Sequence, residues 1–352
     1  AKKYTLAGGP YTNMVFPEAA PEEWLNCDQC TDCFKPSFNY RPKQSAQYAL
    51  ALSNFEQSKD APQRYNFGFI ASTDDHTARP GTGYKQYERR KMTFATGVKS
   101  KIWEYKNDAE DPNFPEIPKI TPGESQPDSE RVSSFVYPGG ILAVHANGRG
   151  KDQIWTALKN KNVYGTSGPR ILLWFDLINS PEGKVPMGSE ITMSQNPRFQ
   201  VKAAGSYKQN AGCSPESIDS LSPQRLEYLC AGECYNPSNE RHIIERIEII
   251  KITPQSYPGE AISPLIQDAW KIIPCQGTGE CIVEFEDNNF SRDSVYYVRA
   301  LQEAGPAING APLFEREGFK ICKGSFRTGL EDNCLSMTNE RAWSSPIYIN
   351  KP

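Results

Sequence analysis

The chain has 352 residues, a formal net charge of -3 at pH 7 and 38% hydrophobic residues, with 28 prolines and 26 glycines. This charge argues against a general nucleic-acid or membrane-surface binder, and no apolar run is long enough to cross a bilayer. The length favours two domains, and the proline and glycine content predicts frequent turns and loops. The chain begins at Ala1 rather than at a methionine, so we expect a processed or partial product.

Residues 1–45 form an irregular segment that contains Cys27, Cys30 and Cys33 in two overlapping Cys-x-x-Cys steps. A zinc or iron-sulfur site would need a fourth ligand, and no histidine lies nearby in the sequence. Cys213 or a later cysteine could supply it. Disulfides are the alternative for these three residues.

The ten cysteines are even in number and spread along a loop-rich chain, which favours disulfides and a periplasmic or extracellular location. Sequence alone does not fix their connectivity, so the expected pairs are hypotheses. They are Cys275 with Cys281, Cys322 with Cys334, and Cys213 with Cys230 or Cys234.

A short helix is predicted within residues 45–55, and the apolar run Phe67–Ala71 predicts a buried strand. The run leads into Asp74 and His76, which project the same way if the strand continues, because strand side chains alternate. Carboxylate and imidazole are standard ligands of zinc-like metals. The alternative is a polar strand end that turns into a loop. Two cations, Arg79 and Lys85, follow where a bound anion would need them.

A charged helix is predicted over 84–95, and a surface excursion poor in apolar residues over 107–138. A strand over 139–144 then ends at His145, with Arg149 in the glycine-rich loop behind it. Functional groups gather at the carboxyl ends of strands in α/β folds. His145 is therefore a candidate metal ligand, general base or anion contact, or alternatively a histidine satisfied by local hydrogen bonds.

A helix is expected over 153–161, with Asp152 as its cap and with Ile154, Trp155 and Leu158 on one face. Helices alternating with buried strands up to about residue 170 indicate an α/β layer or barrel. Beyond that point, short alternating runs separated by turns are typical of a β-sandwich. These runs are 171–178, 199–204, 243–253, 281–286, 294–301 and 346–349.

Asp287, Asn289, Ser291 and Asp293 place oxygen atoms at every second residue, as a calcium loop does. The glycine and the bidentate glutamate of an EF-hand are missing, so a hairpin turn is the stronger interpretation. His242 opens a predicted strand, and we interpret it as structural.

Several segments together resemble a bacterial family catalogued as a domain of unknown function, number three-six-zero-four, which is similar to the PHP superfamily (polymerase and histidinol phosphatase). The resemblance runs from about Trp24 to the C-terminus. The segments that carry it are Cys27–Cys33, Phe38–Arg41, Phe69–Lys85, Gly140–Arg149, Ile154–Lys159, Tyr164–Arg170 and Ala342–Ile347.

The resemblance implies a distorted β/α barrel of PHP type followed by a β-rich domain, that is, an α/β part plus an all-β part. The expected division is residues 1–45, the C-terminal part of the barrel over 46–170, and a sandwich-like domain over 171–352. A PHP-type site holds divalent Zn, Mn or Fe and hydrolyses phosphoesters. Asp74 and His76 match its Asp-x-His motif.

In the same site, Arg79, Lys85 and Arg170 are the implied contacts to a small anionic substrate, and His145 and Arg149 are the catalytic candidates. The opening His-x-His pair of the PHP pattern is absent from this chain, which has three histidines in all. We therefore expect that an upstream part of the same precursor completes the barrel, either as a cleaved fragment that stays associated or as a segment missing from this chain. A vestigial site is the third alternative.

The leading hypothesis is thus an exported, PHP-like metal-dependent phosphoesterase. Two alternatives stand beside it: a non-enzymatic extracellular assembly protein, and a ligand-binding module with one structural ion. An oligomeric state is not specified by the sequence.

Overall fold

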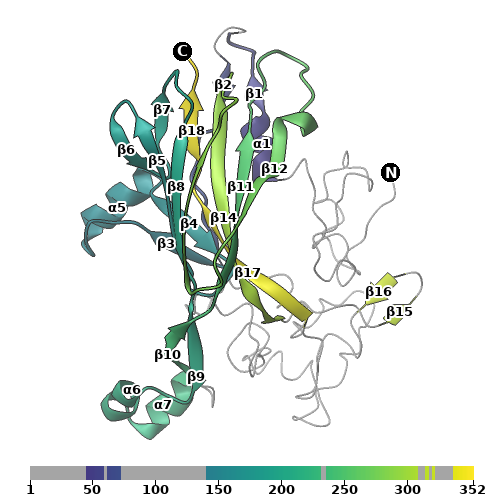
Figure 1. Cartoon of the computed structure of the whole chain (residues 1–352). Coiled ribbons are helices and arrows are strands. Elements are labelled where there is room, and N and C mark those ends of the chain that lie inside the picture. Colours follow the sequence, from purple (N-terminus) through teal and green to yellow (C-terminus); the bar gives the residue numbers. More distant parts are fainter. Residues whose placement is uncertain are drawn as a thin grey trace.

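The structure, a computed structural model, describes residues 45–58, 62–72, 140–230, 235–307, 314–316, 319–321 and 336–352. The two largest of the β-sheets that these residues form pack face to face (Figure 1). One sheet has eight strands and the other has four. The sheet-rich fold expected from the sequence is therefore confirmed.

The large sheet follows the order β12-β11-β14-β17-β4-β3, and β18 pairs with β14 and, in parallel, with β7. Its strands come from distant parts of the chain, so most of its pairings are long-range. They are β3 (Ile141–Val144), β4 (Val163–Thr166), β7 (Glu190–Thr192), β11 (Ile244–Ile252), β12 (Ile266–Pro274), β14 (Ser294–Ala307), β17 (Ser336–Ser344) and β18 (Ile347–Asn350).

The small sheet has the order β13-β8-β5-β6 and is antiparallel throughout. Its strands are β5 (Leu172–Ser180), β6 (Gly183–Pro186), β8 (Arg198–Ala204) and β13 (Glu280–Glu286). Alternate residues of β5 and β8 point inward, as a strand with one buried face requires. Phe175, Phe199 and Phe285 stack between the sheets, with ring centroids 5.3 Å and 4.9 Å apart along the series.

The outer face of the large sheet is covered by helix α1 (Ala46–Ala51) and the segment that follows it. The Ser45 side chain accepts a hydrogen bond from the Tyr48 amide and caps the helix, which confirms the helix predicted here. Leu50 packs with Ile252 of β11 and with Tyr297 of β14 in a second apolar cluster. The sheet is thus buried on both faces in this region.

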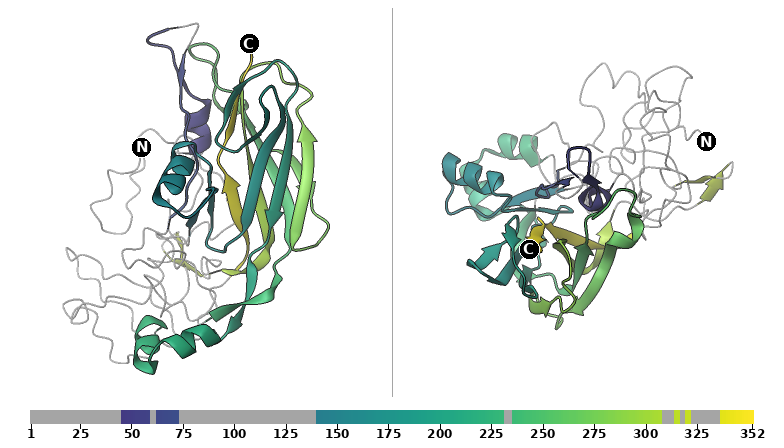
Figure 2. Two further views of the ribbon diagram at one scale, coloured as in Figure 1. Left: turned by 90° about the vertical axis from the view of Figure 1, so that its left-hand side faces the viewer. Right: turned by 90° about the horizontal axis from the view of Figure 1, so that it is seen from above.

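The remaining elements belong to neither of the two packed sheets. A ribbon of β9 and β10 projects away from them and carries α6 and α7 (Figures 1 and 2). These elements are β1 (Ser53–Asn54), β2 (Gln63–Arg64), α5 (Lys151–Lys159), β9 (Tyr207–Ala211), α6 (Pro215–Ser220), α7 (Pro223–Cys230), β10 (Tyr235–Arg241), a 3-10 turn (Ser263–Leu265), β15 (Phe314–Arg316) and β16 (Phe319–Ile321).

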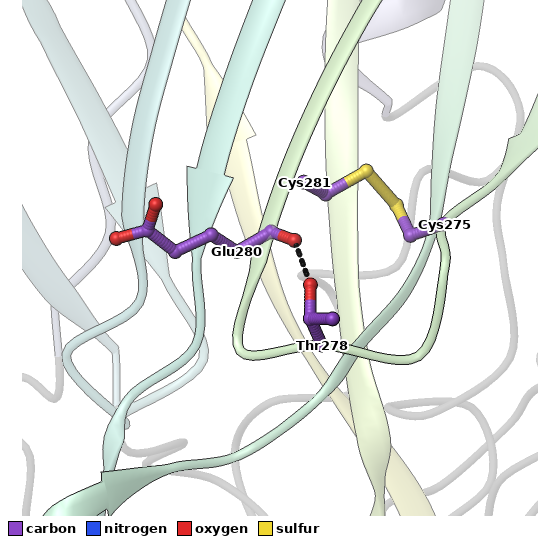
Figure 3. The surroundings of a disulfide bond; sticks show 4 residues. All are labelled: Cys275, Thr278, Glu280 and Cys281. Atoms are coloured by element: carbon purple, nitrogen blue, oxygen red, sulfur yellow. Dashed lines mark hydrogen bonds between the residues drawn. A yellow bond between two sulfur atoms is a disulfide. The ribbon is translucent and has the colours of Figure 1, made fainter.

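The predicted disulfide between Cys275 and Cys281 is confirmed, and Figure 3 shows its surroundings. Cys275 follows β12 of the large sheet and Cys281 lies in β13 of the small sheet, so the bond closes the connection between the two layers. Thr278 Oγ1 donates a hydrogen bond to the Glu280 carbonyl within the same turn. Cys213 is also disulfide-bonded. These bonds favour an oxidising compartment.

The other expected cysteine pairings involve side chains outside the described residues. The Cys27–Cys33 cluster, the charged helix over 84–95 and the excursion over 107–138 lie outside them too. None of the helices that the structure describes has the length and apolar character of a membrane span.

Two features differ from the expectation. The described residues form no closed barrel, so the PHP-like α/β barrel has no support among them. Instead, β3 and β4 extend the sheet that also contains β11, β14 and β17. The division into domains at residue 170 stays a prediction.

The helix α5 also differs in detail. It begins at Lys151 behind Gly150, which has no capping side chain, so the predicted cap Asp152 lies in the first turn instead. The face expected to be buried is largely exposed, with Trp155 at 59% and Ile154 at 38%. Ala157 is the buried residue of this helix because the small side chain faces the sheet.

Candidate functional site

The residues predicted to hold metal and anion, Asp74, His76, Arg79 and Lys85, lie outside the described residues. The segment that leads to them is described up to Ser72. The predicted strand over Phe67–Ala71 has no strand pairing. Side chains satisfy its backbone instead: the Tyr348 hydroxyl accepts from the Phe67 amide at 2.9 Å and donates to the Phe67 carbonyl at 2.7 Å.

The segment runs along β4 from Val163 to Gly165. A Cβ on Gly68 would lie 3.2 Å from Val163 Cγ2, and one on Gly165 would lie 2.7 Å from the Ala71 Cβ. The Phe69 amide donates to Ser345 Oγ at 2.9 Å, which fixes the middle of the segment. The chain thus approaches β4 so closely that only a glycine fits at residue 165.

Ser72 lies beside Gly140, the first described residue after the gap that begins at residue 73. A Cβ on Gly140 would lie 2.9 Å from the Ser72 amide nitrogen. The next residue, Ile141, is opposite Thr166 in the β3–β4 ladder. The chain therefore leaves and re-enters the described region at one place, the carboxyl end of β4. We call this place the β4 junction, defined by Ser72, Gly140 and Thr166.

A hydrogen-bonded loop that begins at Ser167 directly follows Thr166 of the β4 junction. Ser167 donates its amide proton to the Arg341 carbonyl at 2.9 Å, and the Arg341 amide donates to Ser167 Oγ at 2.8 Å. The Ser167 hydroxyl in turn donates to Glu340 Oε2. The next residue, Gly168, has a φ of 135°, which is accessible to glycine but strained for other residues.

Glu340 is the group with the most unusual electrostatic environment at the β4 junction. Burial raises the pKa of its carboxyl above the ordinary value, although the Ser167 hydroxyl and the charge of Arg341 oppose that shift. A carboxyl group with a raised pKa is suited to accept or donate a proton, or to gain a cation as its partner. Arg170, at the end of the same loop, is exposed.

His145 lies at the opposite end of β3. Its amide donates to the Asn162 carbonyl at 2.9 Å, and Val144 is opposite Val163, so His145 is near the start of β4. The five residue steps from Gly140 to His145 span about 16 Å in an extended chain. The structure therefore separates His145, together with the exposed Arg149, from the β4 junction.

The imidazole of His145 has well-defined partners. Nε2 lies 2.8 Å from the Leu173 carbonyl oxygen, and since a carbonyl only accepts, Nε2 carries the proton. The ring lies against Tyr164 and Trp174, at centroid distances of 5.3 Å and 5.7 Å. Only Nδ1 is left for a further interaction. This geometry is that of the locally satisfied histidine described above.

The two carboxylates of the segment spaced like a calcium loop have separate partners. Asp287 accepts hydrogen bonds from Lys251, Tyr296 and the Asn289 amide, whereas Asp293 pairs with Arg64 and with the amide of Lys351. Among the described residues no three His, Cys, Asp or Glu side chains are grouped closely enough to hold a metal ion.

His242 fits the structural role assigned from the sequence. Its Nδ1 lies 2.8 Å from Glu303 Oε1, at the base of the projecting ribbon. Burial alone would raise the pKa of Glu303, but the hydrogen bond from His242 helps to hold it below the ordinary value.

Glu340 is the site residue that the sequence reasoning missed. A single glutamate beside Arg341, in a strand of mixed polarity, is typical of a solvated charge pair. Its hydrogen bond to Ser167, which is 173 positions away in the chain, appears only in the folded structure. The signal that could have pointed to Glu340 is its position two residues before Ala342–Ile347, one of the segments that carry the family resemblance.

Among known proteins, the chain matches one family model. No curated protein and no solved structure matches the chain. Residues 46–211 match the model of a family described as a protein of unknown function, DUF3604. The matched range contains Asp74 and His76 as well as the three residues of the β4 junction. This match covers slightly less than half of the chain, and over that range it agrees with the resemblance found in the sequence.

Proposed function

We propose that the protein is a metal-dependent hydrolase of PHP type, outside the cytoplasm, that acts on a phosphoester. The observation that carries the proposal is the β4 junction, where the chain leading to Asp74 and His76 meets the loop that holds Glu340. Asp74 and His76 follow Ser72 by two and four positions in the sequence. They would contribute a carboxylate and an imidazole to a divalent Zn, Mn or Fe ion.

Each residue has a distinct role in this proposal. A bound divalent metal ion supplies a nucleophilic water at neutral pH and neutralises phosphoryl oxygens. Glu340, with its raised pKa, provides a carboxyl that exchanges a proton near the reacting group. Arg170, with Arg79 and Lys85, binds the anionic part of the substrate. A catalytic role for His145 and Arg149 stays a prediction.

The proposal also includes a further part of the same precursor that completes the metal site. Among the described residues β3 is the last strand of the large sheet, so one of its edges has no strand beside it there. Leu142 of β3 and Ile154 and Trp155 of the adjacent α5 are exposed. An open edge next to exposed apolar side chains is suited to bind another chain segment.

The test measures metal content and hydrolysis in the protein as isolated. Native material is analysed by elemental mass spectrometry and assayed with bis-p-nitrophenyl phosphate. Asp74→Asn and His76→Ala are expected to lose bound metal and hydrolysis together. Asp219→Asn, which changes an exposed aspartate on α6, is the matched control and should keep both. Equal metal content in all three variants would refute the assignment of Asp74 and His76.

The alternative of an extracellular assembly protein is favoured by one observation, the ribbon of β9 and β10 that projects away from the sheets with two helices on it (Figure 2). An element that projects from the fold can be exchanged between protomers, which is one route to an oligomer. Mass photometry of the native protein would test it. A defined oligomer without metal supports assembly, whereas a metal-containing monomer contradicts it.

A further inference from the structure

A pocket of about 340 Å³ is lined by residues of β2, β7, β14 and β18 and of the loops beside them. This volume is within the range of small-molecule sites, about 300–1,000 Å³. Its lining is mostly polar, unlike the interior between the sheets. The side chains that the argument uses are Arg64, Tyr65, Asn66, Glu190, Asp293 and Asn350.

The polar side chains of the pocket are held in place by one another. Asn66 Nδ2 donates to Glu190 Oε2 at 2.5 Å, and Asn350 Nδ2 donates to Glu190 Oε1 at 3.0 Å. Lys161 Nζ donates to Asn66 Oδ1 at 2.5 Å from outside the lining. Because these groups come from separate segments of the chain and are already oriented, a ligand would meet a preorganised surface.

The carboxylates of the pocket argue against charged ligands. Glu190 and Asp293 line it with one cation, Arg64, which already pairs with Asp293, so the charge of Glu190 stays uncompensated within the lining and disfavours an anion. A metal ion would have to compete with existing partners, because Asp293 pairs with Arg64 and accepts the Lys351 amide at 2.6 Å. Glu190 likewise accepts two amide hydrogen bonds. The charge pattern therefore favours a neutral ligand.

The hydrogen-bonding capacity that remains suits hydroxyl groups. A primary amide has two N–H donors, and Asn66 and Asn350 each use one of them on Glu190. A carboxylate has about four lone-pair sites, so Glu190 can accept further hydrogen bonds. A hydroxyl both donates and accepts, and it can therefore bind an amide and a carboxylate side by side.

An exposed aromatic ring adds an apolar surface to the same pocket. Tyr65 is 56% exposed although it lines the pocket. Its position is fixed by contact with Phe67, at a ring centroid distance of 6.5 Å, and the backbone of Phe67 is held by Tyr348. A rigid ring that is open on one side is suited to pack against the C–H face of a sugar ring.

We infer that this pocket binds a neutral saccharide of one or two sugar rings, with Tyr65 against the ring face and Glu190, Asn66 and Asn350 on the hydroxyls. None of these residues belongs to the β4 junction. The inference is therefore independent of the proposed hydrolase activity. It adds a second binding site to the protein.

The test is isothermal titration calorimetry of the full chain with glucose, galactose, mannose, N-acetylglucosamine and their disaccharides. Inorganic phosphate and calcium chloride are titrated in parallel. At least one saccharide should bind saturably, and Tyr65→Ala should weaken it about tenfold or more, since an aromatic contact and its buried area are lost. Glu190→Gln should weaken binding in the same direction, because a neutral amide accepts fewer hydrogen bonds.

Tyr257→Ala is the matched control, because Tyr257 is equally exposed at 57% but does not line the pocket. It should leave the affinity unchanged. Thermal unfolding of each variant shows whether the fold is kept. The inference is overturned if no saccharide gives a saturable titration, if phosphate or calcium alone binds, or if a well-folded Tyr65→Ala variant keeps the full affinity.

Discussion

Lys251 and Asp287 form an ion pair between the two sheets, with side chains only 8% and 1% exposed. The Tyr296 hydroxyl donates to the same carboxylate at 2.5 Å, and the Asn289 amide donates to it at 3.0 Å. The Lys251 ammonium lies 5.3 Å from the centre of the Trp270 ring. Each of the two charged groups has lost its hydrating water on burial and is compensated by the other. The pair therefore stabilises the contact between β11 and the β13–β14 turn only while both residues are present.

Removing one member of this pair should destabilise the fold strongly. We expect Asp287→Ala to lower the free energy of unfolding by about 3–5 kcal/mol, because an unpaired ammonium is left in the interior. The double variant Lys251→Met, Asp287→Leu should be far closer to the parent protein, since it leaves no buried charge. Urea unfolding of the parent and both variants measures the difference.

An exposed pair serves as the control for this prediction. Arg198 and Glu284 are 3.8 Å apart, with side chains 53% and 50% exposed. Glu284→Ala should change the free energy of unfolding by less than about 1 kcal/mol. If Asp287→Ala and Glu284→Ala have similarly small effects, Lys251 and Asp287 are not a buried pair in solution.

The pair of Glu260 and Arg292 predicts a pH dependence. Two hydrogen bonds of 2.8 Å and 3.0 Å join the guanidinium to the carboxylate, and the bond from Arg292 is the main reason that the pKa of Glu260 falls to about 2. Because the folded pKa is below the unfolded one, the stabilisation is complete above about pH 4.5 and is lost as the pH falls toward 2.

The measurement is the free energy of unfolding across this pH range in the parent and in Glu260→Gln. The variant cannot titrate at this position, so its stability should fall less steeply with acid. Glu284→Gln, which changes an exposed carboxylate, should follow the parent curve. A parent and a Glu260→Gln variant with the same slope would contradict the assigned pKa.

The strands of the sandwich could be predicted because their signal is local. Leu173, Phe175 and Leu177 alternate with less buried residues along β5, as a half-buried strand requires. The helix α1 was predictable in the same way, since Ser45 is a good capping residue before an apolar face. The Cys275–Cys281 pair followed from their closeness in the sequence, which leaves a short loop to close.

The features that were predicted wrongly or missed depend on contacts between segments that are distant in the sequence. The run Phe67–Ala71 has the composition of a buried strand, but Tyr348 and Ser345 satisfy its backbone from 281 and 276 positions away. The burial of Ala157 rather than Trp155 depends on which face of α5 meets β3. The β4 junction was likewise invisible in the sequence, because it joins Ser72, Gly140 and Thr166 through pairings that no local pattern specifies.

The close approach of the chain to Gly165 can be tested by adding one methyl group. Gly165→Ala would place a Cβ 2.7 Å from the Ala71 Cβ and 2.9 Å from the Ala71 amide nitrogen. Because a backbone segment must move, we expect a loss of about 1–3 kcal/mol in the free energy of unfolding. Gly148→Ala is the control, since its nearest neighbour would be 3.5 Å away. Equal stability of both variants in urea would show that the segment up to Ser72 does not lie against β4.

Glu340 connects stability to the proposed function. Because burial raises the pKa of its carboxyl, the folded state binds this proton more tightly than the unfolded state does, and the ionised form destabilises the fold at neutral pH. Glu340→Gln should therefore raise the free energy of unfolding at neutral pH, and the gain should vanish as the pH falls below the ordinary pKa of 4.5. If the carboxyl serves the proposed hydrolase site, the same variant should lose phosphodiester hydrolysis while it gains stability.

Glu303→Gln is the control with the opposite sign. The pKa of Glu303 is lowered in the folded state, so removal of this charge should destabilise the protein at neutral pH. Urea unfolding at neutral and acidic pH, together with the hydrolysis assay, separates the two cases. A Glu340→Gln variant that is less stable than the parent at neutral pH would show that the carboxylate is ionised and well paired in the folded protein. The raised pKa at the β4 junction, and with it the proton-exchanging role of Glu340, would then have to be given up.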